Sequence, residues 1–329
     1  MRLLPAFAAL LGVVGTASAL QIDRTAAPRT GLYDTDPGHL WNQLHQILRV
    51  RTASGGSEHG FDAVDPLLWR ETKYLLTGPS HARAIEVLDR FLASHGERLV
   101  RDPLKRAVFQ HDLWAVFDWL ATPSEGDSAA RNSLMWRVAD VMRGVALPRK
   151  DIETLPDTYE AAVASGAIVD RPGAPRQRLG LPSDLFDPAG PWVGIGGSEP
   201  IAAHHAAELG RSAFIVLWNV PGGAARTLEY LHSLWSFPQP FVPDGSFQFA
   251  KDGEVRATLN PALPPIPDGT QIALVRKMLL IDDAGVIVPS NIVESIQLRS
   301  FPGRAFAEVR FSRAALFAGT TGGLRTGSR

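Results

Sequence analysis

The chain has 329 residues, a formal net charge of −1 at pH 7 and no cysteine. Without cysteine it cannot form thiolate zinc sites, iron–sulfur clusters, covalently attached haem or a lipid anchor on a cysteine. Basic and acidic residues are interspersed along the chain, so the sequence predicts no nucleic-acid partner.

The N-terminal segment has the features of a secretory signal peptide. Arg2 provides a short positive start, residues 3–14 are almost wholly apolar, and Ala17 and Ala19 are the small residues that a signal peptidase accepts. We expect cleavage after Ala19 and a periplasmic or secreted mature chain. The alternative is a membrane anchor, but a spanning helix needs about 20 apolar residues. This stretch is shorter and contains Pro5.

We expect no membrane span after removal of the signal. The longest later apolar run, residues 213–220, has the length of a buried strand.

Residues 36–166 show the pattern of an all-helical domain. Asp36-Pro37 and Asp102-Pro103 each place an N-cap carboxylate before a proline at the first helical position. Apolar residues recur at helical spacing after both starts. The helix from Pro103 to Leu120 is apolar on nearly all sides, so we expect it to be buried. The tryptophans of this region suit either a cofactor pocket or core packing, and we favour core packing.

The C-terminal half has a different pattern. Residues 167–191, rich in proline and glycine, predict a linker or a long ordered loop. Residues 192–312 then predict a smaller α+β domain, because runs of strands follow a pair of helices instead of alternating with them. Residues 313–329 are expected to form a disordered tail. The predicted elements after the linker are helices at 198–209 and 224–235, a strand at 212–220, and strands at 271–281, 286–288, 292–301 and 305–311 that form an antiparallel meander.

Two segments resemble a group of exported bacterial proteins of unassigned function. The first is Arg101–Arg106 running into Phe109–Trp119, and the second is Ala273–Arg276 running through Asp282 to Arg299. The resemblance spans most of the mature chain and implies export. It implies no catalytic or binding residue.

The strongest metal-site pattern lies on the two helices of the second half. His204 and Glu208 are four residues apart, and Glu229 and His232 are three apart, so each pair lies on one face of its helix. If the two helices faced each other, these side chains would suit zinc, manganese or iron. The alternative is two solvated helices with ordinary histidine and glutamate residues, which we favour because the spacing is common.

The second candidate site lies on the helix that begins at Pro103. His111 and Asp118 are seven residues apart, which places them on one stripe. A functional interpretation makes His111 a general base or haem ligand in an aromatic pocket. A structural interpretation makes these residues part of a hydrogen-bonded polar network that fixes the position of the helix. We favour the structural interpretation.

Three classes of function follow. We rank first a non-catalytic exported protein that binds an unknown protein or a small apolar ligand, since neither a Gly-x-Ser-x-Gly nor a His-Glu-x-x-His motif is present. The second class is a metal-dependent enzyme built on the His/Glu pairs. The third is a carrier of haem or another apolar ligand between helices rich in tryptophan and phenylalanine.

Overall fold

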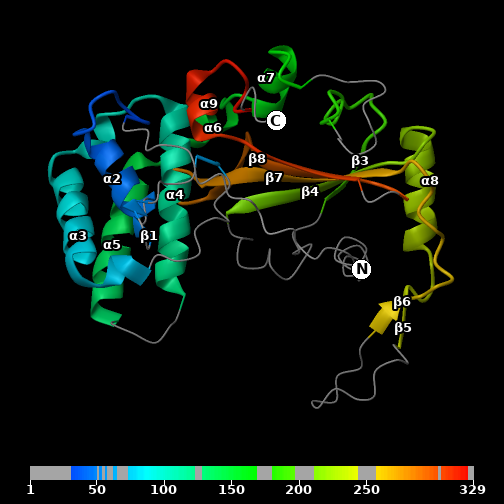
Figure 1. The fold of residues 1–329 in the computed structure, drawn as a ribbon, viewed down its shortest axis with the longest axis horizontal. Coiled ribbons are helices and arrows are strands. Elements are labelled where there is room, and N and C mark those ends of the chain that lie inside the picture. Colours follow the sequence, from blue (N-terminus) through cyan, green and yellow to red (C-terminus); the bar gives the residue numbers. More distant parts are fainter. Residues whose placement is uncertain are drawn as a thin grey trace.

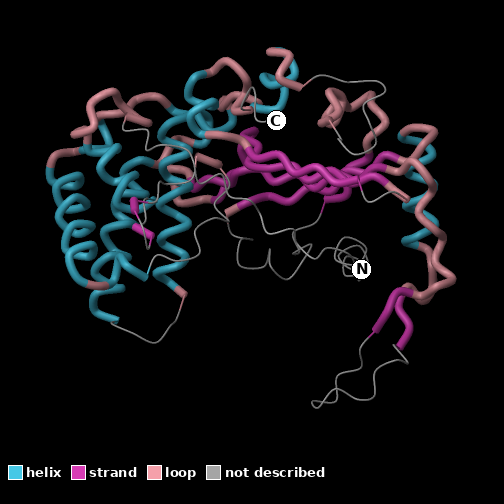
Figure 2. The backbone as a smooth tube through the Cα atoms, viewed as in Figure 1, coloured by secondary structure: helices cyan, strands magenta, loops and turns pink. Residues whose placement is uncertain are grey.

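The computed structural model describes residues 31–49, 52–53, 56–57, 62–64, 73–122, 128–168, 180–196, 211–243, 257–302 and 305–324. Within these ranges helices dominate the N-terminal half and an antiparallel sheet dominates the C-terminal half (Figures 1 and 2). This confirms the predicted α+β class.

A group of long helices forms one end of the molecule (Figure 1). Its core contains Trp41, Leu88, Phe109 and Leu134, all of them buried. The long helices are α2 (Leu40–Arg49), α3 (Gly78–Ala93), α4 (Pro103–Ala121) and α5 (Ser128–Val145), and the shorter elements of this half are β1 (Thr52–Ala53), β2 (Gly56–Ser57), η2 (Lys73–Leu76), η3 (Gly96–Arg98), α6 (Arg149–Glu153) and α7 (Thr158–Ala164).

The large sheet has the strand order β3-β4-β7-β8-β9, and every neighbouring pair is antiparallel. Strands β7, β8 and β9 follow one another as the predicted meander, except that the expected strands 286–288 and 292–301 form one strand, β8, and β4 adds to the meander on the β7 side. Its strands are β3 (Val193–Gly196), β4 (Ser212–Asn219), β7 (Gln271–Ile281), β8 (Ile287–Ser300) and β9 (Ala305–Arg310); outside it lie α8 (Ala224–Trp235), the small pair β5 (Phe241–Pro243) and β6 (Ala257–Leu259), and α9 (Arg313–Ala318).

Successive residues of β7 point to opposite sides of the large sheet and belong to two different cores. Ala273 and Val275 belong to a core shared with α6, α7 and α9. Ile272 and Leu274 belong to a core shared with α8. Figure 1 shows α6, α7 and α9 along one face of the sheet, α8 at one end and the long helices at the other.

Helix α4 joins the long helices to the sheet. Ala107 and Val108 pack into the core that the sheet shares with α6, α7 and α9, whereas Phe109 and Leu113 pack into the core of the long helices. Residues 107–116 of α4 are buried without interruption. The expectation of a buried central helix is therefore confirmed.

Local signals in the sequence explain where α4 and the β7–β8 hairpin begin and turn. The Asp102 carboxylate accepts hydrogen bonds from the backbone N–H groups of Leu104 and Lys105, as an N-cap residue does. In the hairpin, the Asp282 carboxylate accepts from the N–H groups of Ala284 and Val286. Gly285 adopts a φ of +83°, which glycine tolerates best. The structure therefore places a tight turn between β7 and β8.

The expected disordered tail contains ordered structure. Residues 313–318 form α9, the Ser312 hydroxyl caps it at Ala315 N–H, and Leu316 and Leu324 are buried. The segment is rich in glycine and threonine, which predicted disorder, but its two leucine side chains pack into the core. The prediction of disorder from residue 313 is thus wrong for 313–324.

The proline- and glycine-rich segment forms an ordered loop over residues 180–191. Leu181 and Leu185 are buried in the core that the sheet shares with α6, α7 and α9. The Tyr159 hydroxyl donates to the Pro182 carbonyl, and the Trp192 ring N–H donates to Asp184 at 3.0 Å. The alternative of a long ordered loop therefore describes this part better than a linker.

None of the helices that the structure describes is long and apolar enough to cross a bilayer.

Candidate functional site

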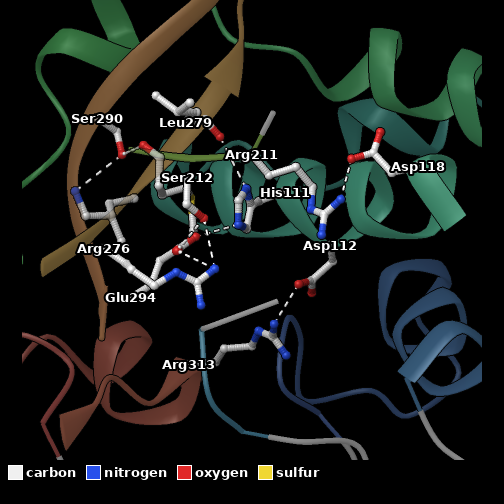
Figure 3. Close-up of polar contacts among 12 residues, drawn as sticks. His111, Asp112, Asp118, Arg211, Ser212, Arg276, Leu279, Ser290, Glu294 and Arg313 are labelled. Atoms are coloured by element: carbon white, nitrogen blue, oxygen red, sulfur yellow. Dashed lines mark hydrogen bonds and ion pairs between the residues drawn. The ribbon is translucent and has the colours of Figure 1, made fainter. Parts of the chain in front are cut away.

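Helix α4 carries four polar side chains that contact the sheet, the residue before β4 or α9, and Figure 3 labels three of them, His111, Asp112 and Asp118. The first, Gln110, pairs with the backbone of Ile281 in both directions. Its Nε2 donates to the Ile281 carbonyl at 2.7 Å, and its Oε1 accepts from the Ile281 N–H at 3.1 Å. The side-chain amide thus satisfies backbone groups of β7 that lie against the helix.

His111 and Glu294 form the centre of the site. The Nε2 atom of His111 lies 2.6 Å from Oε1 of Glu294, and both side chains are fully buried. The other ring nitrogen, Nδ1, lies 3.2 Å from the Leu279 carbonyl oxygen. Each ring nitrogen therefore faces an oxygen atom, one of a carboxylate and one of a backbone carbonyl.

The second oxygen of Glu294 faces β4 and β7. It accepts from the Ser212 hydroxyl at 2.7 Å and lies 3.6 Å from the Arg276 guanidinium. Arg276 also donates to the Ser212 hydroxyl at 3.1 Å. Glu294 is thus held by one helix and two strands besides its own.

A β-bulge explains how Glu294 comes to face α4. Arg276 pairs with Ser295 across the strands, and Lys277 pairs with Val293, so Glu294 is an extra residue on β8. A bulge of this kind re-aims a side chain relative to the regular alternation of a strand.

Burial and charge act on Glu294 in opposite directions. Burial is the largest single influence and raises the pKa of its carboxyl group, because the charged form loses water. The positive charges of His111 and Arg276, with the hydrogen bonds from His111 and Ser212, lower it and together outweigh burial. The net result is a pKa for Glu294 below its ordinary value.

Two further ion pairs fasten α4. Asp112 accepts from the Arg313 guanidinium of α9 at 2.6 Å, and Arg313 is fully buried. Asp118 pairs with Arg211, the residue before β4. His111 and Asp118, which we considered as one site, therefore each bind a different partner on the sheet side of the helix (Figure 3).

The arrangement is poorly suited to catalysis. The Ser212 hydroxyl donates to Glu294 and not to His111, so the histidine is not placed to take its proton. Both nitrogens of His111 are engaged, and the ring is inaccessible to solvent. Binding of haem iron to His111 would require breaking one of these contacts. The geometry favours the structural interpretation, a polar network that fixes α4 on the sheet.

The aromatic residues of the long helices pack against one another. The rings of Trp41 and Phe109 stack with centroids 4.4 Å apart. Phe91 lies 6.1 Å from Trp41, and Tyr33 lies 5.3 Å from Phe109. These distances are those of direct ring contacts, so the four rings form a core cluster and favour core packing over a cofactor pocket.

Half of the predicted metal site can be located. Glu229 and His232 lie on α8 with exposed side chains, and Glu229 pairs with Arg226 at 2.6 Å. His204 and Glu208 fall outside the described residues. Among the residues that are described, no group of three or more His, Asp or Glu side chains is placed to hold a metal ion. The four-residue site stays a prediction.

Sequence reasoning missed the residues that bind side chains of α4, which are Glu294, Arg313 and Arg211, and the two that bind Glu294 in turn, Ser212 and Arg276. A signal was present for two of them, because Arg276 and Glu294 are charged residues within predicted strands that are rich in apolar residues. Charged side chains are almost never fully buried unless they are paired. What the sequence lacked was any indication of which charges meet.

Comparison with known proteins adds no further constraint: no protein-family model, no curated protein sequence and no solved structure matches this chain.

Proposed function

We propose that this chain is an exported, non-catalytic protein that acts by binding another molecule. The export part rests on the signal-peptide pattern of residues 1–19. The binding part rests chiefly on one observation. Among the described residues, the group best suited to acid–base chemistry consists of His111, Glu294 and Ser212. These side chains are buried, and Glu294 contacts both of the others.

Large apolar side chains that are exposed on the surface also support the proposal. Trp136 on α5 is 65% exposed, and Phe306 on β9 is 46% exposed. Aromatic side chains are enriched in binding surfaces. Exposed single residues are common, however, so it is the combination with a closed interior that favours binding over catalysis.

The metal-dependent enzyme remains the second candidate of the sequence, and it requires His204 and Glu208. The Arg226–Glu229 ion pair weighs against it, since the carboxylate already has a cationic partner. Metal analysis of the purified chain, combined with its melting temperature with and without added zinc, separates the two functions. Stoichiometric metal that zinc can replace would favour the enzyme.

The proposed function is tested in two steps in cells that make the protein. First, mass spectrometry of the exported fraction should find a chain that begins at Leu20. Second, a photoreactive phenylalanine at position 136 or 306 should cross-link a partner, whereas the same probe at the exposed polar positions Arg101 and Lys150 should not. Full-length chain in the cytosol would contradict export, and cross-links equally strong at all four positions would contradict a specific binding surface.

A further inference from the structure

A second arrangement, separate from the buried network, lies at the β9 edge of the sheet. Arg299 of β8 and Phe306 of β9 are direct neighbours across the strands. The guanidinium carbon of Arg299 lies 5.4 Å from the centre of the Phe306 ring, a cation–π distance. Phe306 is 46% exposed, so the charged group is stacked on a ring that solvent reaches.

Arg299 differs from the other arginines on this side of the sheet. Arg310 pairs with Glu308 at 3.0 Å, and Arg276 faces Glu294. Within the part of the chain that the structure describes, Arg299 has neither a carboxylate within ion-pair distance nor a hydrogen-bond acceptor. Its side chain is partly buried, and this loss of water lowers the pKa of Arg299. A partly desolvated guanidinium without a counter-charge is costly for the fold and is poised to accept an anion.

We propose that Arg299 and Phe306 together bind an acidic segment of a partner protein, with a carboxylate on the guanidinium and an apolar side chain against the ring. This inference rests on the proposed binding function and deepens it. The planar guanidinium presents paired N–H groups that match the two oxygens of a carboxylate. The cation–π contact with Phe306 restrains that group before the partner arrives, which reduces the ordering cost of binding.

The surroundings favour a peptide carboxylate over the other anions that arginine binds. Glu308 lies on the same side of β9 as Phe306, two residues further along, and it pairs with Arg310, so the described residues of β9 offer no second unpaired positive charge for a phosphate dianion. Nucleic acid would need a cluster of basic side chains, and the neighbouring Arg310 is already paired with Glu308.

The test is a peptide-display selection on the purified full chain, with wild type and three variants compared. Arg299→Gln removes the charge, Phe306→Ala removes the ring, and Arg83→Gln is the matched control because Arg83 is an exposed arginine on α3. We expect wild type and Arg83→Gln to enrich peptides with Asp or Glu beside an apolar residue. We expect Arg299→Gln and Phe306→Ala to lose that preference while remaining folded, with Arg299→Gln melting no lower than wild type, because it removes a partly desolvated charge.

Titration of the most enriched peptide gives the magnitude. Replacing its acidic residue by the amide, or Arg299 by Gln, should each weaken binding about tenfold or more, and the double change should add little. Arg299→Lys should rescue binding only in part, since lysine lacks the planar fork. Enriched peptides without acidic residues, or equal binding to Arg299→Gln, would overturn the inference. So would inorganic phosphate alone raising the melting temperature of wild type but not of Arg299→Gln.

Failure here is distinguishable from failure of the proposed function. If the partner cross-linked in cells also binds Arg299→Gln with unchanged affinity, the binding function stands and this site is wrong. If no partner and no peptide binds at all, both are wrong.

Discussion

The Nε2 atom of His111 in the middle of α4 lies 2.6 Å from the Oε1 atom of Glu294 in the middle of β8, and solvent reaches neither side chain. This polar contact joins α4 to the sheet. Ala107 and Val108, one turn earlier on α4, join the same two parts by apolar packing. Buried ions are tolerated when each is paired and hydrogen-bonded. Here the carboxylate is shared by His111, Arg276 and Ser212.

Removing the shared carboxylate should destabilise the fold strongly. Glu294→Gln leaves His111 and Arg276 buried without their counter-charge, and breaking a buried pair in this way typically costs about 3–5 kcal/mol. The matched control is Asp89→Asn, which removes the exposed pair between Asp89 and Arg137 and should cost about 0–1 kcal/mol. Unfolding in urea measures both. Equal losses in the two variants would show that the buried network contributes nothing special.

The same carboxylate should make stability depend on acid. Because the pKa of Glu294 is lowered in the fold from its ordinary 4.5, its stabilising contribution is fully present above pH 4.5. As the pH falls below that value the unfolded chain takes up the proton first, and the contribution is lost as the pH passes through the lowered folded-state pKa. The unfolding free energy of wild type should therefore fall more steeply in acid than that of Glu294→Gln.

The control for acid sensitivity is Glu86→Gln, because Glu86 pairs with Arg83 on the surface. Because an exposed ion pair contributes little, this substitution should change the unfolding free energy by only about 0–1 kcal/mol. A Glu294→Gln profile that is parallel to wild type would contradict a lowered pKa for this group.

Gly96 should not tolerate alanine. A Cβ atom there would lie 2.6 Å from the Phe91 ring, and the Gly96 carbonyl accepts from the Trp41 ring N–H at 2.8 Å. Overpacking of a filled core costs about 1–3 kcal/mol. Gly144 in α5 is the control, since its nearest neighbour would be 3.6 Å away, and alanine there should stabilise by about 0.5–1 kcal/mol. Thermal unfolding compares the two, and similar melting temperatures would contradict the packing argument.

Gly322 should be required for the close approach of the C-terminal segment to α7, because a side chain there would clash with the helix. A Cβ atom there would lie 2.2 Å from the Thr158 carbonyl oxygen, and the residue has a φ of +60°. Gly319 also has a positive φ, +72°, but a Cβ atom there would meet nothing within 4 Å. Alanine at 319 should therefore cost about 1–2 kcal/mol from backbone strain alone, and alanine at 322 more.

Hydrogen exchange locates the effect of the two glycine substitutions. Gly322→Ala should speed exchange of the Ser312 and Leu324 amides, which donate to Gly323 and Thr321, while the sheet keeps its protection. If Gly319→Ala and Gly322→Ala are equally destabilised, close contact with α7 is not the reason for glycine at 322.

Much of the secondary structure could be predicted, because its signals are local. The Asp102-Pro103 start, the apolar run of β7 and the apolar positions of α8 each lie within one short stretch, and the structure places α8 at Ala224–Trp235 and β7 at Gln271–Ile281 as expected. Helix α9 was missed because its order depends on Leu316 and Leu324 reaching a core built by other segments.

The sequence alone determined the fold class and the identity of α4 as a buried helix with polar residues that need partners. Only the tertiary structure decided what those partners are. Hydrophobic periodicity fixes which face of an element is buried, but it says nothing about which distant segment covers that face. The pairing of His111 with Glu294 depends on the register of β7 and β8 and on the bulge at Glu294. The cation–π contact between Arg299 and Phe306 depends on the register of β8 and β9. A shift of one residue in either register would turn each side chain to the other face.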